Sequence, residues 1–166
     1  MAEIRPFRAL RYTALAGDIS SCVCPPYDII SPAERESLLR KNKYNLVRLE
    51  LPQGENKYAE AGVLLREWLE KGVLARDETP GIYIYRELFS VAGKDYVLTG
   101  LVGLVKLYDF SERVILPHEE TLKKAKQDRF DLMCATGCNF SSVYSLYSDE
   151  SGVIAQVIAN KTKEPP

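Results

Sequence analysis

A single histidine, set between a proline and two glutamates, marks the segment of this sequence best suited to proton transfer. The segment is Pro117-His118-Glu119-Glu120-Thr121, and His118 is the only histidine in the chain. An imidazole beside a carboxylate can exchange protons near neutral pH. Either glutamate can instead favour the start of a following helix, where acidic residues are stabilised. His118 and Glu119 are therefore candidate catalytic residues, with helix capping as the alternative.

A second polar segment joins two prolines to an aromatic and an acidic residue. Pro25-Pro26-Tyr27-Asp28 is expected to form a stiff turn, because the proline rings restrict the backbone. Tyr27 and Asp28 would then be held at low entropic cost and are candidates for binding a substrate. An ordinary turn stabilised by the Asp28 side chain explains the same pattern equally simply.

A third group of polar residues follows the histidine in a stretch rich in lysine. Lys126 and Arg129 are three residues apart, so both lie on one side of a helix. Together they can hold a phosphate, with the planar Arg129 side chain binding two oxygens at once, and we expect both to lie near His118. The alternative is a solvated helix face. The chain has no Walker loop, G-x-G-x-x-G or G-x-S-x-G motif.

The four cysteines suggest a metal site only weakly. They form the pairs Cys22/Cys24 and Cys134/Cys138, which are far apart in the sequence. Zinc sites usually combine C-x2-4-C pairs or one such pair with histidines. We interpret the cysteines as ordinary thiols in a reducing compartment, and zinc binding would require all four to converge.

Composition narrows the class of protein. The chain has 166 residues, a net charge of −1, 46% hydrophobic and 27% charged residues, which is typical of a soluble globular protein. No stretch predicts a membrane span or a secretory signal, so we expect a cytoplasmic protein without membrane partners. The balanced charge argues against nucleic-acid binding. The length predicts a single domain over residues 1–160 and a polar tail over 161–166.

The elements that must position the candidate residues alternate between helices and strands. Ser31-Pro32-Ala33-Glu34 predicts a capped helix start, and Gly93-Lys94 between two β-rich runs predicts a long hairpin. Helices are expected at 31–41, 55–71, 121–135 and 151–160; strands are expected at 4–12, 21–24, 45–51, 81–92, 95–110 and 140–147. This order favours an α+β fold with a mixed, largely antiparallel sheet, a central hairpin and flanking helices.

The same polar segments carry a resemblance to a known family. The segments are Ile4-Arg5-Pro6-Phe7-Arg8-Ala9-Leu10-Arg11-Tyr12, Pro25-Pro26-Tyr27-Asp28-Ile29-Ile30-Ser31-Pro32, Tyr44-Asn45-Leu46-Val47-Arg48-Leu49, Leu116-Pro117-His118-Glu119-Glu120-Thr121 and Lys126-x-Asp128-Arg129. Together they resemble the N-terminal part of the Domain of Unknown Function 1015 family, over nearly the whole chain. Longer members carry an Asp-Gly-His-His-Arg motif, which this sequence lacks, so we expect a truncated or shortened relative.

That family in turn resembles the ParB/sulfiredoxin-like group, which includes an archaeal free-serine kinase with a Pro-His-Glu motif. Pro117-His118-Glu119 matches this tripeptide, and the resemblance implies that Glu119 is the base for a serine-like hydroxyl while His118 contacts substrate or phosphate. It further implies a nucleotide, ATP or ADP with Mg²⁺, and a small-molecule substrate. We therefore expect half of a phosphotransferase site. The alternative is a non-catalytic module that binds a nucleotide, a metabolite or a partner protein for regulation.

Overall fold

The computed structural model describes residues 2–118 and 122–163. The chain divides into two compact units. The first, called here the helical unit, consists of Ala9–Glu78 and Leu116–Ser142. The second, called the hairpin unit, consists of Met1–Arg8, Thr79–Ile115 and Val143–Pro166.

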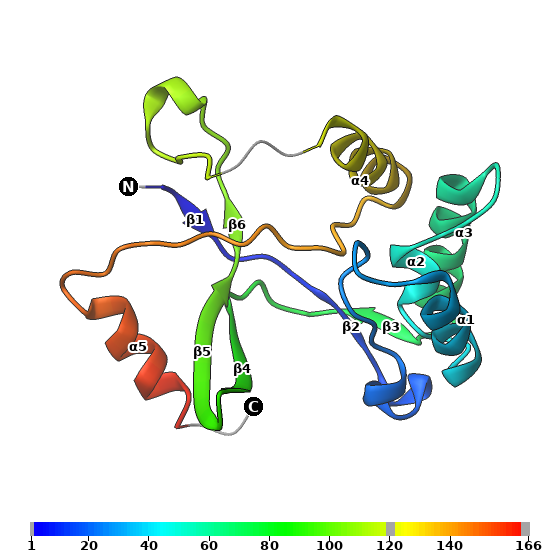
Figure 1. The fold of residues 1–166 in the computed structure, drawn as a ribbon, viewed down its shortest axis with the longest axis horizontal. Helices are drawn as coiled ribbons and strands as arrows, with labels where there is room; N and C mark the ends of the chain where they lie inside the picture. The colour runs from blue at the N-terminus through cyan, green and yellow to red at the C-terminus, as the bar shows by residue number, and fades with distance from the viewer. Residues whose placement is uncertain (1, 119–121, 164–166) are drawn as a thin grey trace. The chain divides into compact units, whose positions relative to one another are not determined.

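The helical unit is built from four α-helices and one pair of short strands among its described residues. In chain order these are β2 (Leu10–Tyr12), α1 (Pro32–Lys41), α2 (Val47–Glu50), α3 (Lys57–Glu70), β3 (Leu74–Arg76) and α4 (Lys123–Thr136) (Figure 1). Two short 3-10 turns, Ala14–Ala16 and Ile19–Ser21, follow β2. β2 and β3 pair antiparallel, with Arg11 opposite Ala75.

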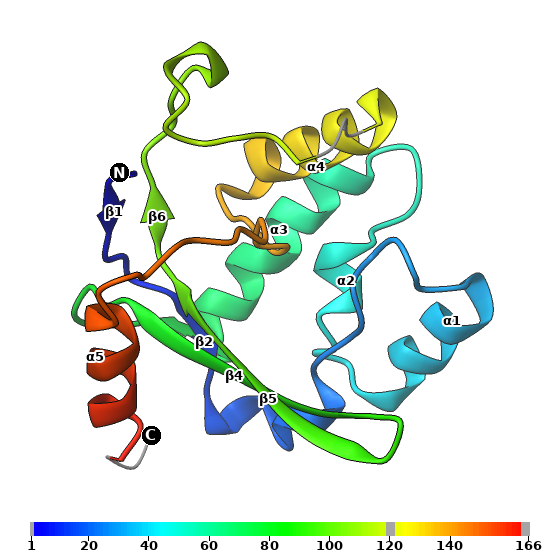
Figure 2. The same ribbon diagram turned by 60° about the vertical axis from the view of Figure 1, so that its left-hand side comes forward.

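The core of the helical unit forms around Trp68, whose side chain is 1% exposed. Apolar residues at helical spacing on α3 bury one face of that helix. The buried hydrophobic cluster comprises Ala16, Cys22, Leu49, Ala61, Leu65, Trp68, Val73, Leu74 and Leu132. α3 and α4 lie side by side (Figure 2), and a β-carbon added at Gly62 would be 2.6 Å from the carbonyl oxygen of Ala135. The glycine therefore permits the close approach of these two helices.

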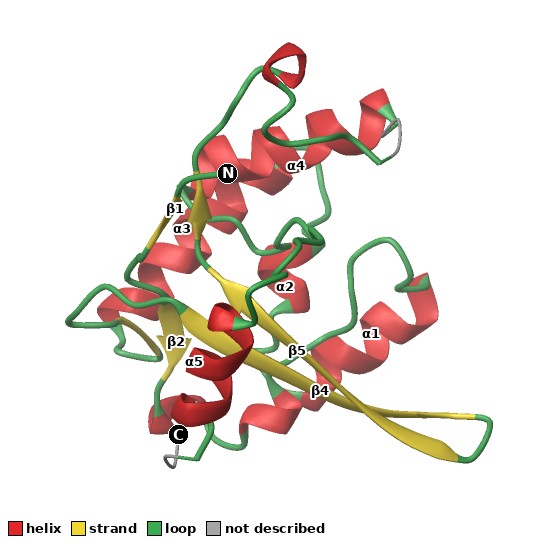
Figure 3. Ribbon diagram, turned by 90° about the vertical axis from the view of Figure 1, so that its left-hand side faces the viewer, coloured by secondary structure: helices red, strands yellow, loops and turns green. Residues whose placement is uncertain are grey.

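The hairpin unit consists mainly of β-strands. Its elements are β1 (Ile4–Arg5), β4 (Tyr83–Val91), β5 (Lys94–Val102), β6 (Leu104–Val105), a 3-10 turn (Phe110–Glu112) and α5 (Val153–Lys161). β4 and β5 form the long antiparallel hairpin in Figure 3, and β1 pairs antiparallel with β6. Ala92 and Gly93 at the hairpin tip both have positive φ, as a tight two-residue turn requires.

The structure confirms the α+β class and several predicted elements. Ser31 accepts a hydrogen bond from the Glu34 backbone N–H at the start of α1, as the capping motif predicts. The hairpin turns at Gly93, and α4 ends at Gly137 in the left-handed conformation. Antiparallel pairing also holds, although the strands form three separate two-stranded sheets rather than one.

Three strand predictions were wrong, and those for 4–12 and 95–110 were right only in part, since no strand continues beyond Val105 in the second of them. The run 45–51 contains the helix α2, because the Asn45 side chain accepts from the Val47 N–H and donates to two backbone carbonyls, which turns the chain. The segment 21–24 is a turn followed by irregular chain, and 140–147 has no strand. The run 4–12 splits into β1 and β2, and its two parts belong to different units. The prediction of a single domain over 1–160 stays a prediction.

Candidate functional site

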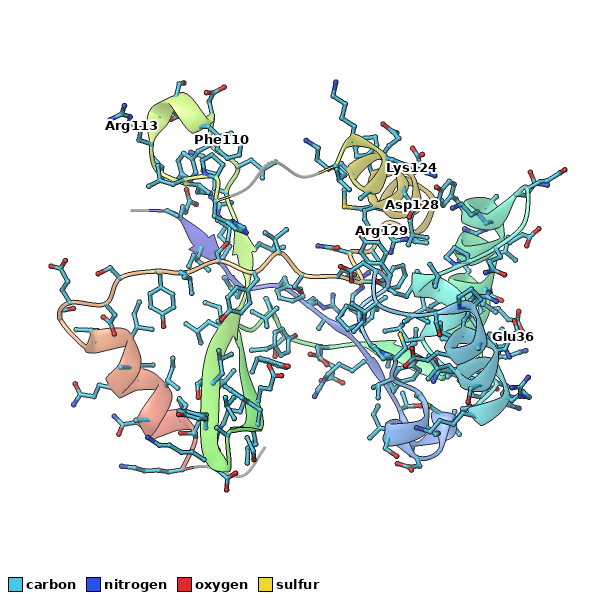
Figure 4. All side chains as sticks on the ribbon, in the orientation of Figure 1. Glu36, Phe110, Arg113, Lys124, Asp128 and Arg129 are labelled. Atoms are coloured by element: carbon cyan, nitrogen blue, oxygen red, sulfur yellow. The ribbon has the colours of Figure 1, made fainter. Side chains whose placement is uncertain are left out.

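Arg129 on α4 is the centre of a polar network within the helical unit (Figure 4). Its Nη1 donates to the Glu50 carbonyl oxygen at 2.8 Å and lies 3.4 Å from the Glu50 carboxylate. Its Nε and Nη2 donate to the Asp128 carboxylate at 3.0 and 2.5 Å. The guanidinium also lies over the Tyr27 ring, 4.0 Å from the ring centroid. One side chain thus joins α4, α2 and the Pro25-Pro26 turn.

Asp128 connects the same network to the start of α3. Its Oδ1 accepts from Lys57 Nζ and from the Tyr58 hydroxyl, each at 2.7 Å. Partial burial acts to raise the pKa of Asp128. The hydrogen bonds from Lys57, Arg129 and Tyr58 outweigh that effect and hold the pKa well below its usual range. Asp128 is therefore ionised at neutral pH.

Glu50 is the buried end of the network. It is 3% exposed, at the last residue of α2. Its Oε1 accepts from the Ser141 hydroxyl and Arg129, whereas its Oε2 is buried without a donor from the described residues. Burial and the nearby Glu50 carboxylate raise the pKa of the Cys24 thiol to about 11, so this cysteine is protonated at neutral pH.

Two of the residues predicted as binding residues are brought together. Tyr27 and Arg129 stack on each other, although they come from segments far apart in the sequence. Asp28 is exposed in the same turn, in which the Ile29 N–H donates to the Pro26 carbonyl. Because Arg129 already binds protein acceptors, a phosphate would have to displace some of them. Phosphate binding by Arg129 stays a prediction.

The predicted residues around the start of α4 are only partly described. His118 is exposed in the segment before the helix, and Glu119 lies outside the described residues. Lys126 is exposed within the first turns of α4, where Lys123 and Lys124 are exposed as well. The first turn contains no acidic residue, and no side chain caps it among the residues that the structure describes.

Sequence reasoning missed Glu50, Lys57, Tyr58 and Ser141 as members of the network. Glu50 lies with Arg48 in the otherwise apolar run Leu46–Leu51, and charges inside such a run were the available signal. Lys57 and Tyr58 lie on α3 and Ser141 lies in the irregular chain after α4, and only the tertiary fold brings them to Asp128 and Glu50.

The described residues contain no group of three or more histidine, cysteine or acidic side chains arranged to hold a metal ion. All four cysteines are free. Among residues 2–118 and 122–163, none of the helices has the length and apolar character that crossing a membrane requires.

Comparison with known proteins gives one match. The family model described as "Protein of unknown function (DUF1015)" matches residues 4–166. A search of curated proteins and a search of solved structures each found no match to this chain. Because the match spans nearly the whole sequence, including every residue of the network around Arg129, the chain belongs to the DUF1015 family.

Proposed function

We propose that this chain binds the phosphates of a nucleotide at the N-terminal end of α4 and takes part in phosphoryl transfer to a hydroxyl of a small, amino-acid-like molecule. The observation that carries the proposal is the charge at this helix end. Lys123, Lys124 and Lys126 are exposed in the first turns of α4, and the first turn lacks an acidic residue.

Lysines are unfavourable at this position in an isolated helix, because the backbone N–H groups there already carry partial positive charge. A bound phosphate makes lysines favourable at this helix end, since both the lysines and the free N–H groups then interact with an anion. Mg²⁺ bound with the nucleotide would neutralise further charge on the phosphates.

The network around Arg129 supports the proposal by fixing the helix. Asp128 and Arg129 tie α4 to α2 and α3 through charged hydrogen bonds, which are stronger than neutral ones, and Arg129 stacks on the Tyr27 ring. A helix held in this way keeps its first turn in a defined position. Arg129 and Asp128 act as positioning residues in this scheme.

The proposed chemical step follows from the Pro117-His118-Glu119 motif. The substrate hydroxyl gives its proton to the Glu119 carboxylate, and the hydroxyl oxygen forms a bond to the terminal phosphorus of the nucleotide. The bond between that phosphorus and the bridging oxygen breaks, which leaves a nucleotide one phosphate shorter and a phosphorylated substrate. His118 contacts the substrate or the transferred phosphate.

The test measures nucleotide binding and phosphoryl transfer separately, with Mg²⁺ and either ATP or ADP, and with L-serine as the first hydroxyl substrate. Glu119→Gln should abolish transfer while nucleotide affinity stays unchanged. Lys124→Gln and Lys126→Gln should each weaken nucleotide binding about tenfold, or ~1.4 kcal/mol. Lys163→Gln, an exposed lysine of the hairpin unit, is the matched control.

Three results separate the possibilities. Transfer that survives Glu119→Gln contradicts the assignment of the base. Nucleotide binding that depends on the α4 lysines, without transfer to any hydroxyl substrate, favours the non-catalytic binding module. Absence of nucleotide binding by the wild-type chain contradicts both the phosphotransferase and the nucleotide-binding module.

A further inference from the structure

A separate cavity lies beside the second half of α3. It has a volume of about 350 Å³ and is lined by Lys43, Tyr44, Arg48, Leu64, Glu67, Trp68 and Lys71. This volume is at the lower end of the range in which small-molecule sites occur, about 300–1,000 Å³. The contacts of Asp128 involve the opposite end of α3, at Lys57 and Tyr58, so the cavity and the network around Arg129 are different sites.

The lining combines the partly exposed Tyr44 ring, which covers the buried Trp68, with excess positive charge. The Tyr44 and Trp68 rings meet edge to face, with centroids 5.6 Å apart, and Leu64 adds aliphatic surface. Lys71 forms a salt bridge with Glu67, which compensates one of the three cations. Neither Lys43 nor Arg48 has a carboxylate partner within the described part of the chain.

The contacts of these two cations are incomplete. Lys43 Nζ lies 4.8 Å from the centroid of the Tyr44 ring. Arg48 Nη2 donates to the Leu39 carbonyl at 2.9 Å, but its Nε is buried with no acceptor among the described residues. A partly buried guanidinium without a counterion is costly, because the charge has lost water and gained no opposite charge. An anion bound in the cavity would supply that charge.

We propose that this cavity binds a small organic anion, with its carboxylate or phosphate between Lys43 and Arg48 and its flat apolar body against Tyr44 and Leu64. The shared chemistry of the ligand is one anionic group on a ring-sized body. Trp68 is the only tryptophan in the sequence and its ring contacts that of Tyr44, so its fluorescence can respond to a ligand in this cavity.

The test titrates the full chain with phenyl phosphate, with benzoate and with benzylamine, which has a similar ring but the opposite charge. Either anion should give a saturable change in Trp68 fluorescence that weakens as salt is added. The anion with the lower dissociation constant, phenyl phosphate or benzoate, identifies the preferred anionic group. Benzylamine should give no saturable change.

Two variants and one control assign the signal to the proposed residues. Lys43→Gln and Arg48→Gln should each raise the dissociation constant at least tenfold, whereas Lys163→Gln should leave it unchanged. Arg48 also donates a hydrogen bond to the Leu39 backbone carbonyl, so its replacement can affect folding. If the Arg48 variant does not fold, the affinity of Lys43→Gln alone tests the proposal. Equal binding of benzylamine, unchanged affinity in Lys43→Gln, or absence of a saturable signal with both anions would overturn the proposal.

Discussion

Leu49 of the helical unit has 0% of its surface exposed, whereas Leu88 of the hairpin unit keeps 75%. The same contrast holds more widely. Every residue of the buried hydrophobic cluster belongs to the helical unit, and no described residue of the hairpin unit is fully buried. Burial of apolar surface is the main source of folding free energy. The helical unit therefore has its own source of stability, and the polar network around Arg129 is built upon it.

The hairpin unit relies instead on backbone pairing and on contacts between neighbouring strands. β4 and β5 form nine residue pairs, and Phe89 stacks on Tyr96 across the hairpin. Such cross-strand pairs contribute only about 0.2–1 kcal/mol each. An isolated two-stranded hairpin is marginally stable in water. Apolar residues therefore stabilise this protein only where the fold buries them.

The largest expected effect comes from removing core volume. Leu49→Ala should destabilise the protein by roughly 3 kcal/mol, because it leaves a cavity as well as losing buried surface. Leu88→Ala, the matched control in the hairpin unit, should change stability by less than about 0.5 kcal/mol. Urea unfolding followed by Trp68 fluorescence measures both. An equal loss of unfolding free energy in Leu49→Ala and Leu88→Ala would show that the two units do not differ in how burial stabilises them.

Gly62 in the helical unit and Gly100 in the hairpin unit test whether close packing differs between the two units. Gly62→Ala should cost about 2 kcal/mol, because overlap with the Ala135 carbonyl outweighs the roughly 1 kcal/mol gained in helix propensity. Gly100 on β5 has nothing within 4 Å of an added β-carbon, so Gly100→Ala should be nearly neutral. Thermal unfolding of both variants checks this. A stabilised Gly62→Ala variant would show that α3 and α4 do not approach so closely.

The charged network should make stability depend on pH. The folded pKa of Asp128 is depressed, so its contribution is complete above the unfolded value of about 3.9 and is lost as the pH falls toward the folded value. Asp128→Asn should cost roughly 1.5 kcal/mol at neutral pH and less in acid. Urea midpoints measured from neutral to acidic pH give the comparison. A constant difference between wild type and variant would exclude Asp128 as the titrating group.

The smallest expected effects come from two turns. Gly137 ends α4 and Gly93 turns the hairpin, and both have positive φ. An alanine at either position costs about 1 kcal/mol. Gly137→Ala should lower the global unfolding midpoint, whereas Gly93→Ala should only speed amide exchange within β4 and β5. A matching drop in midpoint for Gly93→Ala would show that both units unfold together.

Elements with local signals were predictable from the sequence. Ser31 and Pro32 define the start of α1, Gly137 defines the end of α4, and Gly93 defines the hairpin tip, because each residue acts on the backbone next to it. The helix α2 was not predictable in this way. Leu46, Val47 and Leu49 favour a strand locally, but the contacts of Asn45 with Ser21 and Val23 determine the turn.

The candidate site was predictable to a smaller extent. Tyr27 and Arg129 were chosen for separate chemical reasons, and the fold does bring them together. Their partners could not be found, because Glu50, Lys57 and Ser141 have no motif and reach the network only through tertiary packing. Motifs identify residues with reactive groups, whereas burial and hydrogen bonding decide which of those groups are already engaged.

The most direct test of the central claim, that the helical unit holds both the stability and the site, is hydrogen exchange resolved along the chain. Amides of α3 and α4 should exchange only at the rate set by global unfolding, and those of β4 and β5 should exchange much faster through local opening. ATP with Mg²⁺ should slow exchange in the first turns of α4 and leave β4 and β5 unchanged. Protection of β4 and β5 equal to that of α3, or a nucleotide effect confined to the hairpin unit, would contradict the account.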